Sequence, residues 1–266
     1  FSMKLVEGGT LADLNAASMD DMRSFYKRYY SPNNAVIVVA GDFNSAQVKT
    51  WLQDAYGSMP QEKIERKVHE PEWDQPKMQE KLIKRNVQSP ILTTAYLTPP
   101  ASNADTFALN LIAVILGQGE SSRLHRKLVY QNQTATAVRS GCADAILAGK
   151  CMVYVYLKPN IAPQSALKVV DEEIRNLKER KVTAKELEKA KNNYVMDYVN
   201  QLAKINGRAE ALAYNEILFS DYSRLFSDIP SVQAVTSEQI QTAAKKYFKP
   251  QHKNVVIVMP EAKKEI

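Results

Sequence analysis

The chain has 266 residues, a formal net charge of +6, 45% hydrophobic residues and 24% charged residues. These values are typical of an ordinary globular protein with one or two domains. The apolar runs, such as Ala35 to Ala40, are far shorter than the roughly 20 residues needed to span a membrane. Basic and acidic residues alternate, and no basic stripe interleaved with aromatic residues occurs, which argues against nucleic-acid binding.

Two segments 218 positions apart have similar sequences, Ser18 to Val39 and Thr236 to Val258. Placing Tyr29 on Tyr247 also places Pro32 on Pro250, and the second copy has one extra residue before its valine run. This spacing is too long for a solenoid repeat, whose period is roughly 20–50 residues, and it suits a duplicated domain. We therefore expect a C-terminal fragment of a two-domain protein, in which residues 1–58 are the tail of the first domain.

The N-terminal tail contains the first copy of the repeat. Ser18 and Asp21 predict a helix N-terminus, and apolar residues then recur at helical spacing up to Tyr29. The helix is expected to end before Pro32, because proline disfavours helical geometry in the residue that precedes it. The continuous apolar run 35–40 predicts a strand buried on both faces, and a helix is expected over 45–56.

Residues 59–76 are polar and interrupted by prolines, which predicts a linker, and residues 77–266 predict one complete second domain. Strands are expected at about 79–87, 91–97, 135–142 and 151–158. Helices are expected at about 103–116, 121–130, 163–181, 183–205 and 208–219, before the second copy of the repeat. Ser121 is the expected cap of the second of these helices, a Thr183–Glu186 capping box opens the fourth, and Asn206-Gly207 separates the last two. The order of these strands and helices along the chain predicts an α+β fold, with helices flanking a mostly antiparallel sheet.

The two cysteines, Cys142 and Cys151, lie on either side of a predicted turn at Leu147 to Lys150. A cross-strand disulfide bond is one alternative, but the centre of that turn places the two cysteines out of register for it. With so few cysteines in the chain, we expect two free, buried thiols.

Sites for catalysis, metal or phosphate are not predicted in this chain. The segment Gly117 to Leu124 contains two glycines, but it lacks the Gly-Lys-Ser/Thr ending of a phosphate-binding loop and follows a helix. Ser121 and Ser122 precede His125 as neighbours on one helix start, which is not the arrangement of a nucleophile with its base. The histidines His69, His125 and His252 have no second ligand at metal-binding spacing.

Several segments carry a resemblance to a known family: Asp20–Asp42, Tyr96–Pro100, Ile115–Leu124, Lys127–Tyr130, Thr183–Lys191 and Gly207–Ala213. On these residues the chain resembles the pitrilysin/insulinase-type zinc metallopeptidases, and the resemblance extends over essentially the whole sequence. It implies that residues 1–58 end the zinc-bearing first domain and that residues 77–266 form the second, catalytically inactive domain.

The resemblance also implies which part of the protein carries the catalytic zinc site. The family's H-x-x-E-H motif supplies two zinc ligands and a base, and the zinc activates a bound water. No such motif occurs here; His69-Glu70 lacks the second histidine, and the motif is expected before Phe1. The resemblance therefore implies zinc in the intact parent, and neither metal nor peptidase activity in this fragment.

The second domain of many relatives also supplies an Arg and a Tyr, seven residues apart, that hold the substrate. Val129 and Thr136 occupy those two positions here, and neither side chain can stabilise an oxyanion as Arg and Tyr do. The resemblance thus implies a peptide or unfolded protein substrate and a homologous subunit, in a hetero- or homodimer, that supplies the pair. The alternatives are a non-catalytic scaffold subunit and a processing enzyme for a peptide-derived cofactor. A bacterial periplasmic location is expected by family resemblance, with a mitochondrial one as the alternative.

Overall fold

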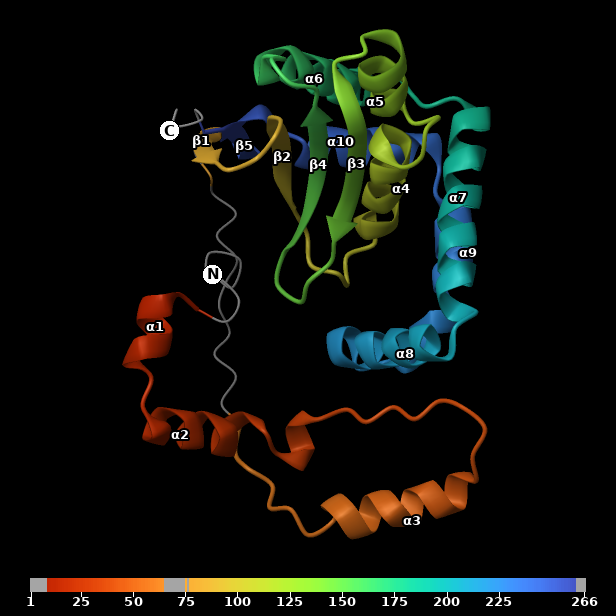
Figure 1. Ribbon diagram of the computed structural model, residues 1–266. Coiled ribbons are helices and arrows are strands. Elements are labelled where there is room, and N and C mark those ends of the chain that lie inside the picture. Colours follow the sequence, from red (N-terminus) through yellow and green to blue (C-terminus); the bar gives the residue numbers. More distant parts are fainter. Residues whose placement is uncertain (1–8, 65–74, 76, 262–266) are drawn as a thin grey trace. The chain divides into compact units, whose positions relative to one another are not determined.

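The computed structural model describes residues 9–64, 75 and 77–261 (Figure 1). The chain divides into two compact units. The smaller unit comprises residues 1–72 and 202–222, and the larger unit comprises residues 73–201 and 223–266. Most of the predicted linker, together with His69 and Glu70, lies outside the described residues. Within the described ranges, no helix combines the length and the apolar character needed to cross a membrane.

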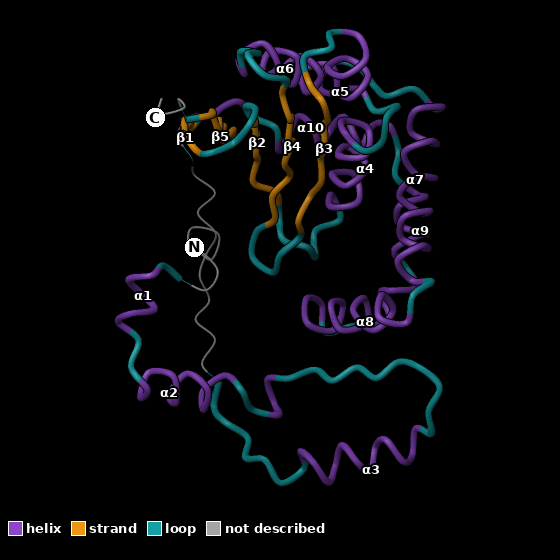
Figure 2. Tube along the Cα trace, viewed as in Figure 1, coloured by secondary structure: helices purple, strands orange, loops and turns teal. Residues whose placement is uncertain are grey.

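The larger unit is built on a five-stranded sheet with the order β1-β5-β2-β4-β3 (Figure 2). Its strands are β1 (Gln79–Arg85), β2 (Ile91–Thr98), β3 (Ala135–Ala143), β4 (Gly149–Leu157) and β5 (Lys253–Pro260). β5 is parallel to β1, whereas the pairs β2–β5, β2–β4 and β3–β4 are antiparallel. The predicted α+β class with a mostly antiparallel sheet is confirmed.

Three helices cover one face of this sheet: α4 (Asp105–Gly117), α6 (Pro163–Glu179) and α10 (Ser237–Tyr247). In α6, Val170, Ile174 and Leu177 recur at helical spacing and are all buried, which is why this helix presents one apolar face. Along β2, buried and half-buried residues alternate strictly, because successive side chains point to opposite faces of a strand. The main hydrophobic core therefore lies between the sheet and these helices.

The second copy of the repeat forms α10 and β5 as predicted. Thr236 and Gln239 make a reciprocal capping box at the start of α10. Phe248 follows the helix and packs edge-on against Tyr96, with ring centroids 4.9 Å apart. The strand β5 then lies between β1 and β2 and pairs with both.

The first copy forms the helix α2 (Met19–Tyr29), opened by a capping box of Ser18 and Asp21 as predicted. The prediction of a buried strand over 35–40 is wrong for the residues that the structure describes. This segment is extended without strand pairing, and Val36 and Ile37 are 42% and 53% exposed. A run of valines acquires strand structure only when a neighbouring strand pairs with it, and none of the described strands does so.

The remaining helices follow the sequence prediction with local differences. The structure contains α1 (Leu11–Ala16), α3 (Ser45–Tyr56), α7 (Ala184–Leu202), α8 (Ile205–Phe219) and α9 (Asp228–Ala234). The break between α7 and α8 falls before Ile205, not at Asn206-Gly207. The reason is that Lys204 has extended backbone and acts as the N-cap, so that Asn206 and Gly207 lie in the first turn of α8.

The expectation of two free thiols is wrong: Cys142 and Cys151 form a disulfide bond between β3 and β4. The two strands extend further toward their connection than predicted, so that Ala143 is paired with Lys150. The turn is therefore centred between Ile146 and Leu147, and Cys142 lies directly opposite Cys151 with the Cα atoms 4.0 Å apart. Directly opposed positions on antiparallel strands bring Cβ atoms close enough for a disulfide.

Candidate functional site

The candidate site is the segment between α4 and β3, which contains the position of the family's Arg. At the end of α4, Gly117 packs against β3, and a Cβ added there would lie 2.8 Å from Ser140 Oγ. Gly119 follows with a positive φ of 75°, a conformation that glycine adopts at little cost. Gly117 thus permits the close contact at the end of α4, and Gly119 permits the turn that follows, which is the helix break that the sequence predicts.

The next helical turn is capped one residue later than predicted. Ser122, not Ser121, is the N-cap residue, and its Oγ donates to the carbonyl of Gly119 at 2.7 Å. The helix runs through α5 (Arg123–His125) and continues as a π-helix over Arg126–Gln131. Short π-helical stretches within helices occur frequently at functional positions.

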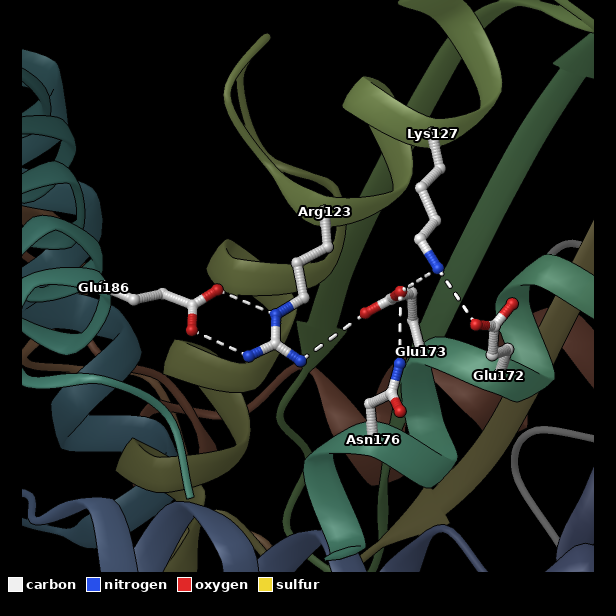
Figure 3. A network of polar contacts seen from close by, with 6 residues as sticks. All are labelled: Arg123, Lys127, Glu172, Glu173, Asn176 and Glu186. Carbon is white, nitrogen blue, oxygen red and sulfur yellow. Dashed lines mark hydrogen bonds and ion pairs between the residues drawn. The ribbon is translucent and has the colours of Figure 1, made fainter. Parts of the chain in front are cut away.

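A network of charges fixes this segment to the helices α6 and α7 (Figure 3). Arg123 donates from Nε and Nη2 to the two carboxylate oxygens of Glu186, both at 2.7 Å. Its Nη1 lies 3.5 Å from Glu173, which also accepts from Lys127 Nζ at 2.7 Å. Lys127 contacts Glu172 as well, at 3.2 Å. Two cations from one segment thus share carboxylates that come from two other helices.

Burial makes Glu173 the centre of this network. Its side chain is 5% exposed, so its charge depends on its partners rather than on water. The hydrogen bond to Glu186 is the main cause that raises the pKa of Arg123, and the one to Glu173 is the main cause that raises the pKa of Lys127. Both cations therefore stay charged. The predicted Thr183–Glu186 capping box is only half formed: Thr183 Oγ1 accepts from the Glu186 N–H, but the Glu186 carboxylate binds Arg123.

The two predicted substrate-holding positions have contrasting environments. Val129 lies in the π-helix, half-buried, and packs against the hydrophobic core. Thr136 lies on β3, exposed, at an irregularity in the pairing with β4, and its Oγ1 donates to the Tyr156 carbonyl at 3.2 Å. Neither residue offers a charged or acidic group to a substrate.

The neighbours of Val129 form an exposed polar cluster. The Tyr130 hydroxyl donates to the Glu120 carboxylate at 3.0 Å, which raises the pKa of Tyr130. The His125 ring lies edge-on to the Tyr130 ring at 5.1 Å, and its Nδ1 is 3.1 Å from the Glu120 carbonyl. The His125 side chain thus contacts neighbouring residues on the helix surface. In the parts of the chain that the structure describes, no three His, Cys, Asp or Glu residues are grouped as metal ligands.

The serines before this helix are also engaged locally. Ser121 Oγ accepts from Lys189 Nζ, and Ser122 Oγ donates to a backbone carbonyl. Neither hydroxyl is bonded to a histidine among the described residues, so this group has no nucleophile–base pair. Sequence analysis did not find the charge network, although Arg123 and Lys127 stand four residues apart, on one face of a helix.

Comparisons with known proteins agree with this architecture. A family model described as the Peptidase M16 inactive domain matches residues 16–194. The zinc protease PqqE of Helicobacter pylori is 25% identical over 261 residues, which cover 95% of this chain and 57% of that protein. The crystal structure of a protease from Helicobacter pylori has a TM-score of 0.86 at 22% identity and covers 95% of this chain and 61% of its own. That of a peptidase M16 inactive domain from Pseudomonas fluorescens has a TM-score of 0.83 at 20% identity, covering 97% of this chain and 61% of its own.

The fold and these matches define the class of the protein: a non-catalytic domain of the zinc-protease-like proteins. More particularly, the chain belongs to the Peptidase M16 inactive-domain family, which confirms the resemblance found in the sequence. The chain spans only a little over half the length of the curated relatives that it matches. The activity, substrate and partners of a whole protein are therefore matters for proposal.

Proposed function

We propose that this chain is the C-terminal portion of a zinc-dependent metalloendopeptidase whose zinc is bound outside these 266 residues. In this proposal, residues 1–58 end the zinc-bearing domain, residues 59–76 link the domains, and residues 77–266 form the second domain. The second domain helps to enclose a peptide or unfolded protein substrate. The observation that carries the proposal is the difference in burial between the two copies of the repeat.

Equivalent residues of the two copies have opposite exposures. In the second copy, Ile240 is 0% and Phe248 is 3% exposed, whereas their equivalents Met22 and Tyr30 are 60% and 63% exposed. An amphipathic helix of this length is stabilised mainly by packing of its apolar face. Among the described residues, the first copy therefore lacks a sheet like the one that the second copy packs on. A homologous domain encoded upstream would supply that sheet.

The face of the sheet opposite the helices supports a role in substrate enclosure. Along β4, Met152, Tyr154 and Tyr156 alternate with the buried residues and are half-buried on this second face. Aromatic and apolar side chains of this kind contact extended peptides without selecting one sequence. A sheet face of this composition suits an enzyme that acts on unfolded chains.

The side chains at positions 129 and 136 support a partner subunit. Val129 and Thr136 cannot hold a substrate backbone against a zinc site as Arg and Tyr do. In our proposal a homologous subunit, in a hetero- or homodimer, supplies that pair. The same two residues also favour the second candidate function, a non-catalytic scaffold subunit of the same fold.

The disulfide bond supports a location outside the cytosol. Disulfides form and persist in oxidising compartments such as the bacterial periplasm, and the Cys142–Cys151 bond is of the structural type within one sheet. We accordingly propose a bacterial periplasmic location, with the mitochondrion as the alternative.

The test is to express the full open reading frame that contains this chain and to measure zinc content and cleavage of a quenched fluorescent peptide. The proposal predicts one zinc per full-length chain, and cleavage that requires a homologous subunit or dimer formation. Full activity of the intact protein as a monomer would contradict the need for a partner. A full-length protein that binds no zinc would refute the peptidase and leave the scaffold function.

A further inference from the structure

The larger unit contains a cavity of about 290 Å³ that has no role in the function proposed above. It lies between the end of α4, the loop at Ser121 and Ser122, and the beginning of α7. Three of the side chains that line it are basic: Arg126, Lys185 and Lys189. The cavity is thus formed by the same segment that carries the charge network, but on the side toward α7.

The basic side chains around the cavity have no carboxylate partners among the described residues. Lys189 Nζ donates to Ser121 Oγ, and neither Arg126 nor Lys185 takes part in an ion pair with another described residue. The acidic residue that lines the cavity, Glu186, is bound by Arg123 through two hydrogen bonds of 2.7 Å (Figure 3). The charge of Glu186 is therefore already compensated, and the cavity keeps an excess of positive charge.

Three other lysines of the larger unit do have carboxylate partners. Lys127 is paired with Glu172 and Glu173, Lys246 with Asp105, and Lys253 with Asp171. Arg126, Lys185 and Lys189 are exposed residues that line one cavity without acidic partners, so their charges repel each other and a bound anion would relieve that repulsion. The arrangement is what a site for a negatively charged group requires.

The start of α7 lines the same cavity through Thr183, Lys185 and Glu186. In this 19-residue helix, Thr183 Oγ1 accepts the N–H of Glu186, and the Thr183 carbonyl accepts that of Leu187. The N–H groups of Ala184 and Lys185 have no partner within the helix, as is general for a first turn. A helix N-terminus carries a partial positive charge and binds anions through such N–H groups. It acts here in addition to the three basic side chains.

We propose that this cavity binds an oxyanion group, carried either by free phosphate or by the C-terminal carboxylate of a peptide. At about 290 Å³ the cavity has room for a phosphate or carboxylate group together with bound waters, since about 10–15 Å³ of such volume admits one water. Arg126, Lys185 and Lys189 neutralise the charge, while Ser121 and Thr183 offer hydroxyl groups at the rim. Neither Val129 nor Thr136 lines this cavity.

The test is calorimetric titration of the purified 266-residue chain at constant ionic strength. One arm uses inorganic phosphate, and the other compares N-acetyl-glycylglycine with its C-terminal amide. We expect saturable binding of phosphate, of the free acid, or of both, and no binding of the amide. The double variant Lys185→Gln/Lys189→Gln should weaken this binding roughly tenfold or more, because two charge-assisted hydrogen bonds are lost.

The matched control is Lys168→Gln/Lys245→Gln, which removes the same charge from exposed positions outside the cavity. Saturation by phosphate alone identifies free phosphate as the source of the oxyanion, and saturation by the free acid alone identifies a peptide end. The proposal is overturned if neither anion saturates the wild-type chain, if the amide binds as well as the acid, or if the control variant loses as much affinity as the cavity variant.

Discussion

The charge network around Glu173 allows a sharp test of how the segment after α4 is held. Glu172 and Glu173 are adjacent on α6 and both contact Lys127, but their side chains are 46% and 5% exposed. Replacing either residue by Gln removes one charge and keeps the size of the side chain. The two variants therefore compare a buried carboxylate, which also pairs with Arg123, with an exposed carboxylate that contacts the same lysine.

The expected losses in the free energy of unfolding differ several-fold between the two variants. Breaking a buried ion pair by removing one partner costs about 3–5 kcal/mol. Because Arg123 keeps Glu186 and Lys127 keeps Glu172, we expect the lower end, about 3 kcal/mol, for Glu173→Gln. An exposed pair contributes about 0–1 kcal/mol, so Glu172→Gln should cost less than about 1 kcal/mol.

The assay is thermal unfolding followed by circular dichroism, at low and at high salt. For a unit of this size, 1 kcal/mol lowers the unfolding temperature by about 2–4 °C, so the loss of about 3 kcal/mol in Glu173→Gln should lower it by about 6–12 °C. High salt should remove the small effect of Glu172→Gln and leave most of the effect of Glu173→Gln, because buried charges are poorly screened. Equal effects of the two variants, or a neutral Glu173→Gln, would refute the reasoning.

Three further predictions concern stability. Gly117→Ala should cost about 1–3 kcal/mol in urea unfolding, since the new Cβ meets Ser140, whereas the control Gly141→Ala, with nothing within 4 Å of the added Cβ, should be nearly neutral. If Gly117→Ala costs as little stability as Gly141→Ala, α4 does not pack on β3 as closely as described. Replacing both cysteines by Ser should cost about 2–3 kcal/mol, because the disulfide closes a short loop, and two titratable thiols in the unreduced wild type would contradict this. Burial raises the pKa of Asp144 above its ordinary 3.8, so its native carboxyl favours folding at low pH and that contribution is lost as pH rises through the native pKa. Asp144→Asn should thus be more stable than wild type at pH 7, and the difference should vanish as pH falls below the ordinary carboxyl pKa of 3.8. A difference that stays constant with pH, or that has the opposite sign, would refute this prediction.

Much of the larger unit could be predicted because its signals are local. The caps at Thr236 and Thr183, the glycines after α4 and the alternation along β2 each determine their element from neighbouring residues. The fold class and the order of strands and helices follow from these local patterns. Positions at which tertiary packing decides the outcome were harder to predict.

The failures have a common physical cause. The valine run 35–40 has strand propensity, but a strand forms only with a partner strand, which no local pattern supplies. The disulfide depends on the register of β3 and β4, and a shift of the turn centre by two residues changes which residues are opposite. The charge network joins residues up to 63 positions apart, so its partners could not be paired from spacing alone.

The central claim is that the catalytic zinc of the proposed peptidase is bound outside these 266 residues. Elemental analysis of the purified chain, after incubation with zinc and dialysis, tests this claim most directly. The proposal predicts far less than one zinc per chain, both before and after the incubation. One tightly held zinc per chain would contradict it.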